Sequence, residues 1–296
     1  MLMFARRTLI FAFGALALAI TLPRADAYAQ SFAPSRFSVE VSGNGPDVIF
    51  IPGLGSSRAV WQTQAEALAA THRVHLVQVA GFAGDPVSAP AGAVITPLVE
   101  DLARYIEANT SSLPAIVGHS MGGLTGLMLA RAHPERVGRL MIVDSLPFFS
   151  AMFGPQATAQ NVEPQARMMR DQIARLDDAA FRAQQNAGIG RLMKTETRRA
   201  DVVDWSLASD RATFAQAMYE VMTTDMRGEV ASVRAPITVV YAYDAAMGPE
   251  AVIDGLYRGG FASAPNVRFV RIDGAHHFIM FDQPAAFQAA VADFLR

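Results

Sequence analysis

The stretch Gly118-His119-Ser120-Met121-Gly122-Gly123 decides how this sequence is interpreted. The apolar residues 115–117 lead into it, and the apolar, helix-like residues 124–132 follow it. This layout predicts a strand, a sharp turn with a serine at its apex, and a helix. Such a turn needs flanking positions that are nearly free of side chain, and Gly118 and Gly122 provide them because glycine tolerates backbone angles that other residues resist.

A serine in this setting is typical of a nucleophile elbow, in which the hydroxyl is held above a sheet at the positive end of the following helix. Matches to Gly-x-Ser-x-Gly arise by chance in a chain with 22 glycines, so the alternative is a packing turn around an ordinary serine. The strand–turn–helix context favours Ser120 as a nucleophile.

Strands and helices alternate on both sides of this turn. Apolar patterning predicts strands at residues 37–41, 48–51, 74–79, 115–117, 140–143, 237–241 and 267–272. It predicts helices at residues 60–70, 95–108, 124–132, 250–258 and 285–295. Alternation of this kind implies parallel pairing through right-handed crossovers. We therefore expect an α/β fold with a mostly parallel sheet flanked by helices.

The alternation is interrupted between residues 146 and 228, where helical periodicity continues without a convincing strand. We expect this stretch to be a helical lid inserted into a core made of residues 30–145 and 229–296. Its methionine and phenylalanine side chains have two interpretations. They form the core of the insertion itself, or they line an apolar acyl pocket, a role that suits the adaptable shape of methionine.

Composition excludes several classes of protein. Hydrophobic residues make up 51% of the chain and charged residues 18%, which is enough for a large core and unlike a disordered protein. The formal net charge of −2 gives no basic patch for nucleic acid. The chain has no cysteine, so disulfides and thiolate metal sites are excluded.

The first 29 residues have the pattern of a secretory signal peptide. Arg6-Arg7 precede the apolar residues 9–22, and Ala27-Tyr28-Ala29 offers a small-x-small cleavage site. The apolar run is shorter than the ~20 residues that a membrane-spanning helix needs. We therefore expect cleavage after Ala29, export to the periplasm or the medium, and no stable membrane anchor afterwards.

A serine hydroxyl needs a general base, which is most often histidine. After the strand at residues 267–272 comes Asp273-Gly274-Ala275-His276-His277-Phe278, which places histidine on the same rim as Ser120. The two histidines compete, because both side chains cannot point inward. We favour His277 as the base.

A third group, a carboxylate, should orient that base. Asp244 follows the strand at residues 237–241 and lies between the serine and the histidine in sequence. The order Ser120, Asp244, His277 is the order found in α/β hydrolases. Asp144 is the alternative acid, because it also ends a strand; its other role would be to brace the turn into the insertion. We favour Asp244. For the oxyanion we expect the backbone amides of Met121 and Leu54.

The chain resembles the α/β-hydrolase superfamily in its form with a helical lid, over about residues 37–296. The resemblance rests on the Ser120 turn and on residues 274–284, Gly-Ala-His-His-Phe-Ile-Met-Phe-Asp-Gln-Pro. It supports His277 over His276, and it implies an oxyanion hole at Leu54 and Met121 under a lid. It also implies that His119 braces the turn. The loop around Asp244 lacks the family's common glycine and is slightly short, which keeps Asp144 as an alternative.

We predict from these features an exported serine hydrolase that cleaves carboxylic esters through an acyl-enzyme. The substrate is expected to be a small molecule with an apolar acyl group, and no metal or organic cofactor is required. The same triad serves lactone hydrolysis, carbon–carbon bond hydrolysis and haloperoxidation, and fold alone does not rank these reactions. A non-catalytic binding protein with this fold is the remaining alternative. The sequence leaves the oligomeric state open.

Overall fold

A single seven-stranded sheet organises the part of the chain that the computed structural model describes, residues 32–87 and 92–296. Its strand order is β1-β3-β2-β4-β5-β6-β7. Strands β2 to β7 pair in parallel, and β1 joins the edge antiparallel to β3. The strands are β1 (Phe37–Ser42), β2 (Asp47–Ile51), β3 (Arg73–Val79), β4 (Ala115–His119), β5 (Arg139–Val143), β6 (Ile237–Tyr243) and β7 (Val267–Asp273). The predicted α/β class is confirmed.

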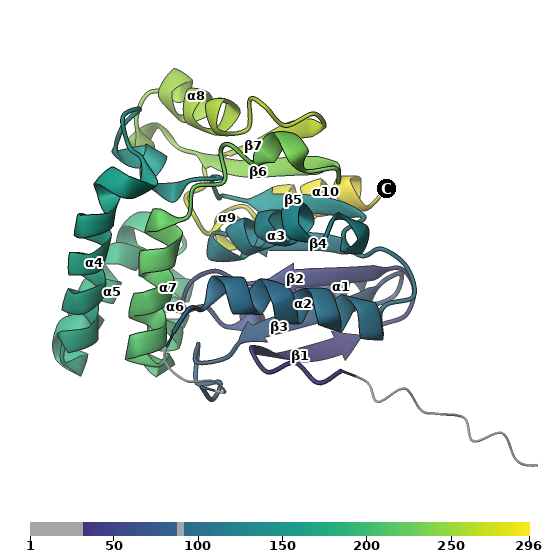
Figure 1. Cartoon of the computed structure of the whole chain (residues 1–296), viewed down its shortest axis with the longest axis horizontal. Helices are drawn as coiled ribbons and strands as arrows, with labels where there is room; N and C mark the ends of the chain where they lie inside the picture. The colour runs from purple at the N-terminus through teal and green to yellow at the C-terminus, as the bar shows by residue number, and fades with distance from the viewer. Residues whose placement is uncertain (1–31, 88–91) are drawn as a thin grey trace, which may run out of the picture. The chain divides into compact units, whose positions relative to one another are not determined.

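Helices cover both faces of this sheet (Figure 1). One face carries α2 (Ile95–Asn109), α3 (Met121–Ala132) and α8 (Glu250–Gly260). The other carries α1 (Gln62–Leu68), α9 (Ile279–Asp282) and α10 (Pro284–Leu295).

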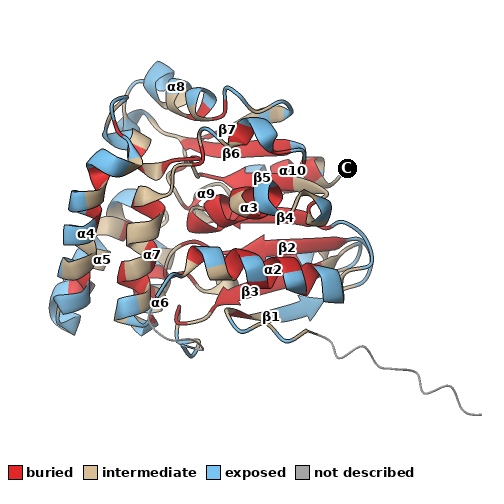
Figure 2. Ribbon diagram, in the orientation of Figure 1, coloured by how far each residue is buried: buried red, intermediate tan, exposed pale blue. Residues whose placement is uncertain are grey.

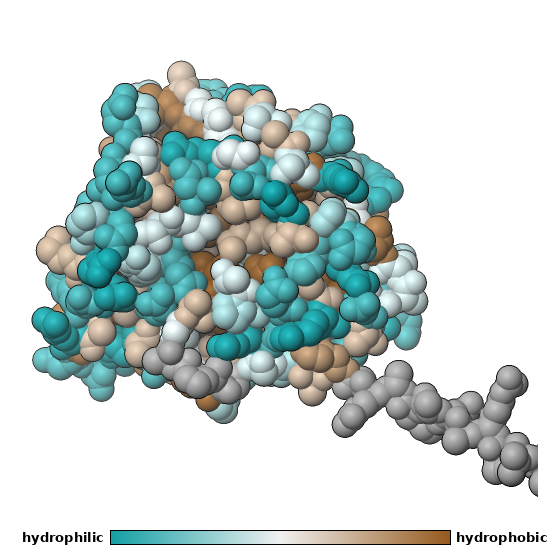
Figure 3. Space-filling view, in the orientation of Figure 1, coloured by the Kyte–Doolittle hydropathy of each residue, from teal (hydrophilic) through white to brown (hydrophobic). Residues whose placement is uncertain are grey.

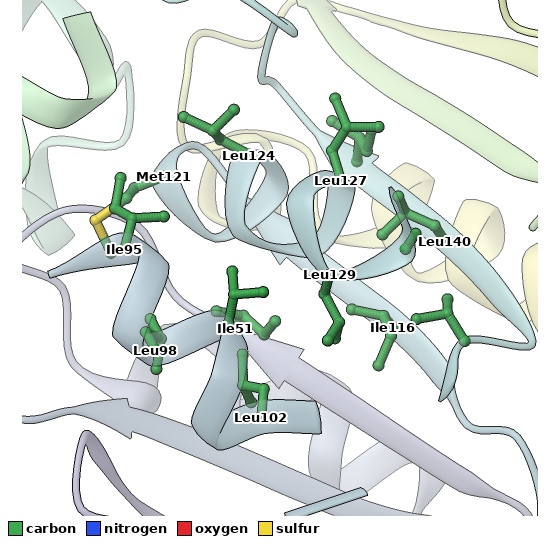
Figure 4. Packing of buried hydrophobic residues seen from close by; sticks show 14 of the residues in the cluster. Ile51, Ile95, Leu98, Leu102, Ile116, Met121, Leu124, Leu127, Leu129 and Leu140 are labelled. Atoms are coloured by element: carbon green, nitrogen blue, oxygen red, sulfur yellow. The ribbon is translucent and has the colours of Figure 1, made fainter. Parts of the chain in front are cut away.

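Successive side chains of a strand point to opposite faces, so each central strand contributes to two cores. In β2, Ile49 and Ile51 pack with α2 and α3, while Val48 and Phe50 pack with Trp61 and α10. Figure 4 shows the first of these cores, where Ile51 and Ile116 of the sheet meet Leu98 and Leu129 of the helices. Figure 2 shows that the central strands are buried, while the edge strand β1 is largely exposed. The central strands are continuous apolar runs because helices cover both of their faces.

The segment between β5 and β6 contains four α-helices and no strand among its residues, all of which are described. They are α4 (Ala159–Arg175), α5 (Asp178–Leu192), α6 (Arg199–Ala208) and α7 (Arg211–Thr223). Figure 1 places them beside the carboxyl ends of the parallel strands. Contacts agree with this placement, because a Cβ on Gly55 after β2 would lie 2.6 Å from Phe214, and one on Gly81 after β3 would lie 3.1 Å from Thr213.

Residues 32–296 form one compact unit, apart from the undescribed residues 88–91. The predicted signal peptide, residues 1–29, lies outside the described residues. Within the described residues, none of the helices combines the length and the apolar character needed to cross a membrane. The face shown in Figure 3 is a mixture of hydrophilic and weakly hydrophobic residues, with strongly hydrophobic ones only in small patches.

Candidate active site

Ser120 occupies the turn between β4 and α3, and its backbone has φ 54° and ψ −120°. A positive φ is uncommon for a residue with a side chain and is found where the surrounding structure enforces it. The two flanking glycines allow it. A Cβ on Gly118 would lie 2.1 Å from the carbonyl oxygen of Gly122, and a Cβ on Gly122 would lie 2.2 Å from that of Ile51. The structure has the geometry of a nucleophile elbow.

Two backbone amides beside Ser120 have no partner within the described residues. Met121 N is the first amide of α3, and Leu54 N belongs to the loop after β2; neither donates to a protein acceptor there. The loop passes close to the serine, since a Cβ on Gly53 would lie 3.2 Å from the Cβ of Ser120. These amides are the donors expected for the oxyanion, and they suit that role because they are not already engaged.

His277 and Asp144 form the central contact of the site. Nδ1 of His277 lies 2.7 Å from Oδ2 of Asp144 and donates a hydrogen bond to it. The other carboxylate oxygen of Asp144 accepts hydrogen bonds from the amide of Ala242 at 2.9 Å and from the hydroxyl of Tyr257 at 2.8 Å. Asp144 itself has φ 46°, so its side chain turns away from the course of β5.

Asp144 is buried and ionised. Burial acts to raise the pKa of its carboxyl, but the hydrogen bonds from His277, Ala242 and Tyr257 outweigh burial and lower that pKa below its ordinary value. Burial and the neighbouring Asp144 charge in turn raise the pKa of Tyr257, so its hydroxyl stays protonated and donates. The result is a fixed negative charge behind His277.

The backbone brings Ser120 next to this pair. The Ser120 amide donates to the carbonyl of Val143 at 2.9 Å, and Val143 precedes Asp144. His119, the residue before Ser120, has its ring centroid 4.5 Å from that of His277. No hydrogen bond joins Oγ of Ser120 to His277 in the described part of the chain. Catalytic contacts of this kind commonly tighten only when substrate binds.

The structure does not bring Asp244 to His277, contrary to our expectation. Strand β6 continues to Tyr243, two residues beyond its predicted end, so Asp244 lies past the rim where β4 and β5 end. There the Asp244 carboxylate forms an ion pair with Lys194 and accepts from the amide of Ala246 at 2.9 Å. The alternative acid, Asp144, takes the place beside the histidine. The short loop around Asp244, which had kept Asp144 as an alternative, was the signal in the sequence that pointed to this arrangement.

The neighbouring histidines have other partners. Nδ1 of His276 donates to the carbonyl of Arg191 at 3.0 Å, so its ring is turned to the helical insertion. Nε2 of His119 donates to the carbonyl of His277 at 2.9 Å. Burial, with a smaller effect of His277, lowers the pKa of His119 to about 3, so this ring is neutral and braces the histidine loop.

The helical insertion packs onto the loop that holds Leu54. The side chain of Leu54 contacts an apolar cluster formed by the insertion. The members of that cluster are Ile173, Phe181, Phe214 and Ala215, with Met169, Leu176, Leu207 and Met218 packed against it. Two of the phenylalanine rings, Phe181 and Phe214, meet edge to face at 5.4 Å. Much of the apolar surface of the insertion is therefore its own core.

A cavity of about 510 Å³ in the described structure lies apart from these residues. Val79 and Ala80 line it together with α4 and α7, and neither Ser120 nor His277 does. Cavity size alone would have indicated a different site. The chemistry of the elbow and of the buried acid–histidine pair identifies the candidate site instead.

Residues 46–284 match the family model described as "alpha/beta hydrolase fold". The chain belongs to the α/β hydrolase family. The match covers strands β2 to β7, the elbow, the insertion and the histidine loop.

Named relatives in this family include esterases and hydrolases. A pimeloyl-[acyl-carrier protein] methyl ester esterase of Aeromonas hydrophila is 38% identical over 114 residues, which are 38% of this chain and 43% of that protein. The putative carbamate hydrolase RutD of Variovorax paradoxus is 28% identical over 275 residues, covering 88% of this chain and 96% of that protein. The first of these alignments thus spans less than half of its relative.

Solved structures share the fold at low identity. The enol-lactonase of Burkholderia xenovorans superposes with a TM-score of 0.71 at 21% identity, covering 88% of this chain and 96% of that one. A thermophilic esterase of Thermogutta terrifontis gives 0.73 at 20% identity, covering 90% and 98%. At this level of identity, these similarities show a shared fold.

Proposed function

We propose that this protein is a serine hydrolase that cleaves carboxylic esters with Ser120 as nucleophile, His277 as general base and Asp144 as the acid that orients it. The observation that carries the proposal is the 2.7 Å hydrogen bond between His277 and Asp144 at the rim that holds the Ser120 elbow. A pure binding protein has no need for a buried charge behind a histidine beside a strained serine. The named esterases among the relatives agree with this chemistry.

The proposed reaction has two halves, the formation of an acyl-enzyme and its hydrolysis, and His277 transfers protons in both. Oγ of Ser120 attacks the ester carbonyl carbon while Nε2 of His277 takes its proton, and Asp144 stabilises the imidazolium that results. The amides of Leu54 and Met121 hold the oxyanion of the tetrahedral intermediate. His277 then gives its proton to the leaving alcohol, and the acyl-enzyme remains. Water activated by His277 attacks that acyl-enzyme and releases the acid.

The insertion supports an apolar acyl group as part of the substrate. Its helices lie over the oxyanion loop, and Leu54 joins the loop to their apolar cluster. A substrate that reaches the oxyanion donors therefore passes beside aliphatic and aromatic side chains. We infer that α4 to α7 act as a lid. The leader pattern of residues 1–29 supports export, which mass spectrometry of the mature N-terminus would test.

A fluorophosphonate probe tests the nucleophile directly. We expect covalent labelling at Ser120 that disappears in Ser120→Ala and persists in the matched variant Ser232→Ala, whose serine lies on the surface. A series of p-nitrophenyl esters of increasing chain length would then define the acyl group. Folded protein that the probe does not label, and that hydrolyses no ester of the series, would refute the proposal.

A further inference from the structure

One end of the helical insertion is bound to the loop that carries His277. Residues 191–195, the last two residues of α5 and the three that follow it, lie along residues 276–282, and several hydrogen bonds join the two segments. The amide of Phe278 donates to the carbonyl of Leu192 at 3.2 Å, in addition to the bond from His276 to Arg191. These are contacts between parts of the chain about 85 residues apart.

Asp282 is the centre of this junction. Oδ1 accepts from the amide of Thr195 at 2.8 Å, from its hydroxyl at 2.9 Å and from the amide of Lys194 at 3.0 Å. Oδ2 accepts from the amide of His276 at 2.9 Å. One half-buried carboxylate thus binds donors from the insertion and from the residue before His277. Hydrogen bonds to an ionised acceptor are the stronger kind, so this carboxylate fixes both segments.

A second contact holds the same segment to the core. Lys194, the only lysine in the chain, forms its ion pair with Asp244 at the end of β6. The carboxylate that we expected in the triad therefore has a partner of its own from the insertion. The ion pair between Lys194 and Asp244 holds the segment after α5 at the end of β6, beside the histidine loop.

We propose that Asp282 is a positioning residue for His277 and that it acts by tying the histidine loop to the helical insertion. The proposal rests on the proposed function, because it assigns the tie a role in catalysis. It also has a purely structural part, that Asp282 holds the insertion against the loop, which can be measured without any substrate.

Trp205 of α6 reports on the structural part. Its ring lies 6.5 Å from that of Phe281, the residue before Asp282, and it is half-buried. The only other tryptophan, Trp61, is fully buried in the core. Quenching of tryptophan fluorescence by acrylamide therefore reports mainly on Trp205, and an increase indicates that the insertion has separated from the loop.

The test compares Asp282→Asn with the wild type and with Asp293→Asn. The asparagine side chain keeps the shape of aspartate but loses the charge and places an amide group against the amides that the carboxylate accepts from. The control removes a carboxylate from a surface ion pair with Arg268. Thr195→Val, which removes one donor to Asp282, serves if Asp282→Asn does not fold. Each full-length variant is assayed with p-nitrophenyl acetate at a temperature where circular dichroism shows it folded.

We expect Asp282→Asn to increase quenching of Trp205 and to lower kcat about tenfold to a hundredfold, with little change in KM, because a small displacement of a catalytic group has an effect of this size. Thr195→Val should also increase the quenching of Trp205 and lower kcat, but by smaller amounts. Asp293→Asn should change neither the quenching nor kcat. If quenching in Asp282→Asn is unchanged, Asp282 does not hold the insertion against the histidine loop. If quenching increases but kcat is unchanged, Asp282 does not position His277. Absence of both labelling and esterase activity in the wild type refutes the proposed function instead, while quenching still tests the tie.

Discussion

The amide of Ser120 donates a 2.9 Å hydrogen bond to the carbonyl of Val143, which joins the Ser120 turn to β5, the strand that Asp144 follows. Strands β4 and β5 are parallel neighbours, with His119 opposite Val143. Both strands therefore end at the same level, and the serine and the acid emerge side by side. His277 reaches them from the loop after β7. The arrangement follows from the parallel sheet, whose carboxyl ends share one rim.

The elbow leaves no room for a side chain at Gly118. We expect Gly118→Ala to lower the free energy of unfolding by ~3 kcal/mol or more, since its Cβ would meet backbone atoms that cannot move aside. The control is Gly188→Ala within α5, where a Cβ meets nothing within 4 Å. That change should stabilise the protein by about 0.5–1 kcal/mol. Urea unfolding measures both, and equal effects would show that the elbow is not constrained.

The hydroxyl of Tyr257 supports the charge of Asp144. Tyr257→Phe should lower the free energy of unfolding by about 1.5–3 kcal/mol, the usual contribution of a hydrogen bond to a charged group, and should lower kcat severalfold. The stacked neighbour Tyr241 donates to Asp254 instead, so Tyr241→Phe should leave kcat unchanged. Ester hydrolysis and urea unfolding test this pair. A full kcat in Tyr257→Phe would argue against a role for the hydroxyl behind the triad.

Stability should rise with pH between about 3 and 6.5 because of His119. Its pKa is lowered from 6.5 to about 3 in the folded protein, so the unfolded chain binds more protons in that window. The contribution of His119 to stability is complete above pH 6.5 and is lost as pH falls, by up to ~5 kcal/mol at low pH.

The variant His119→Gln retains a donor for the carbonyl of His277 and does not titrate. We expect its unfolding free energy to depend less on pH than that of the wild type, measured by urea unfolding between pH 7.5 and 4.5. His75, whose pKa is also lowered, chiefly by burial, contributes in the same direction in both proteins. Parallel curves for the two proteins would contradict the low pKa of His119.

The sheet could be predicted because its central strands are continuous apolar runs between turn residues, while the edge strand β1 alternates apolar and polar residues. Each of the seven predicted strands is present, within two residues at either end. The antiparallel direction of β1 and the short helix α9 were not predicted. Four residues are too few to show helical periodicity, and pairing direction at a sheet edge leaves little pattern in the sequence.

The choice between the two acids depended on features that local sequence does not contain. Asp144 turns back through a positive φ, which the identity of an aspartate does not reveal. Asp244 is held by Lys194, a residue 50 positions earlier in the chain. Contacts of this range come from tertiary packing, so sequence reasoning could name both candidates but could not show which of them lies beside His277.

The central claim is that Asp144, and not Asp244, orients His277. Its most direct test is the kcat of Asp144→Asn and Asp244→Asn with the same p-nitrophenyl ester, each variant being checked for folding. We predict that Asp144→Asn lowers kcat by about 10³- to 10⁴-fold, the effect of removing a triad acid, while Asp244→Asn costs less than about tenfold. A large loss in Asp244→Asn with near-normal activity in Asp144→Asn would contradict the account.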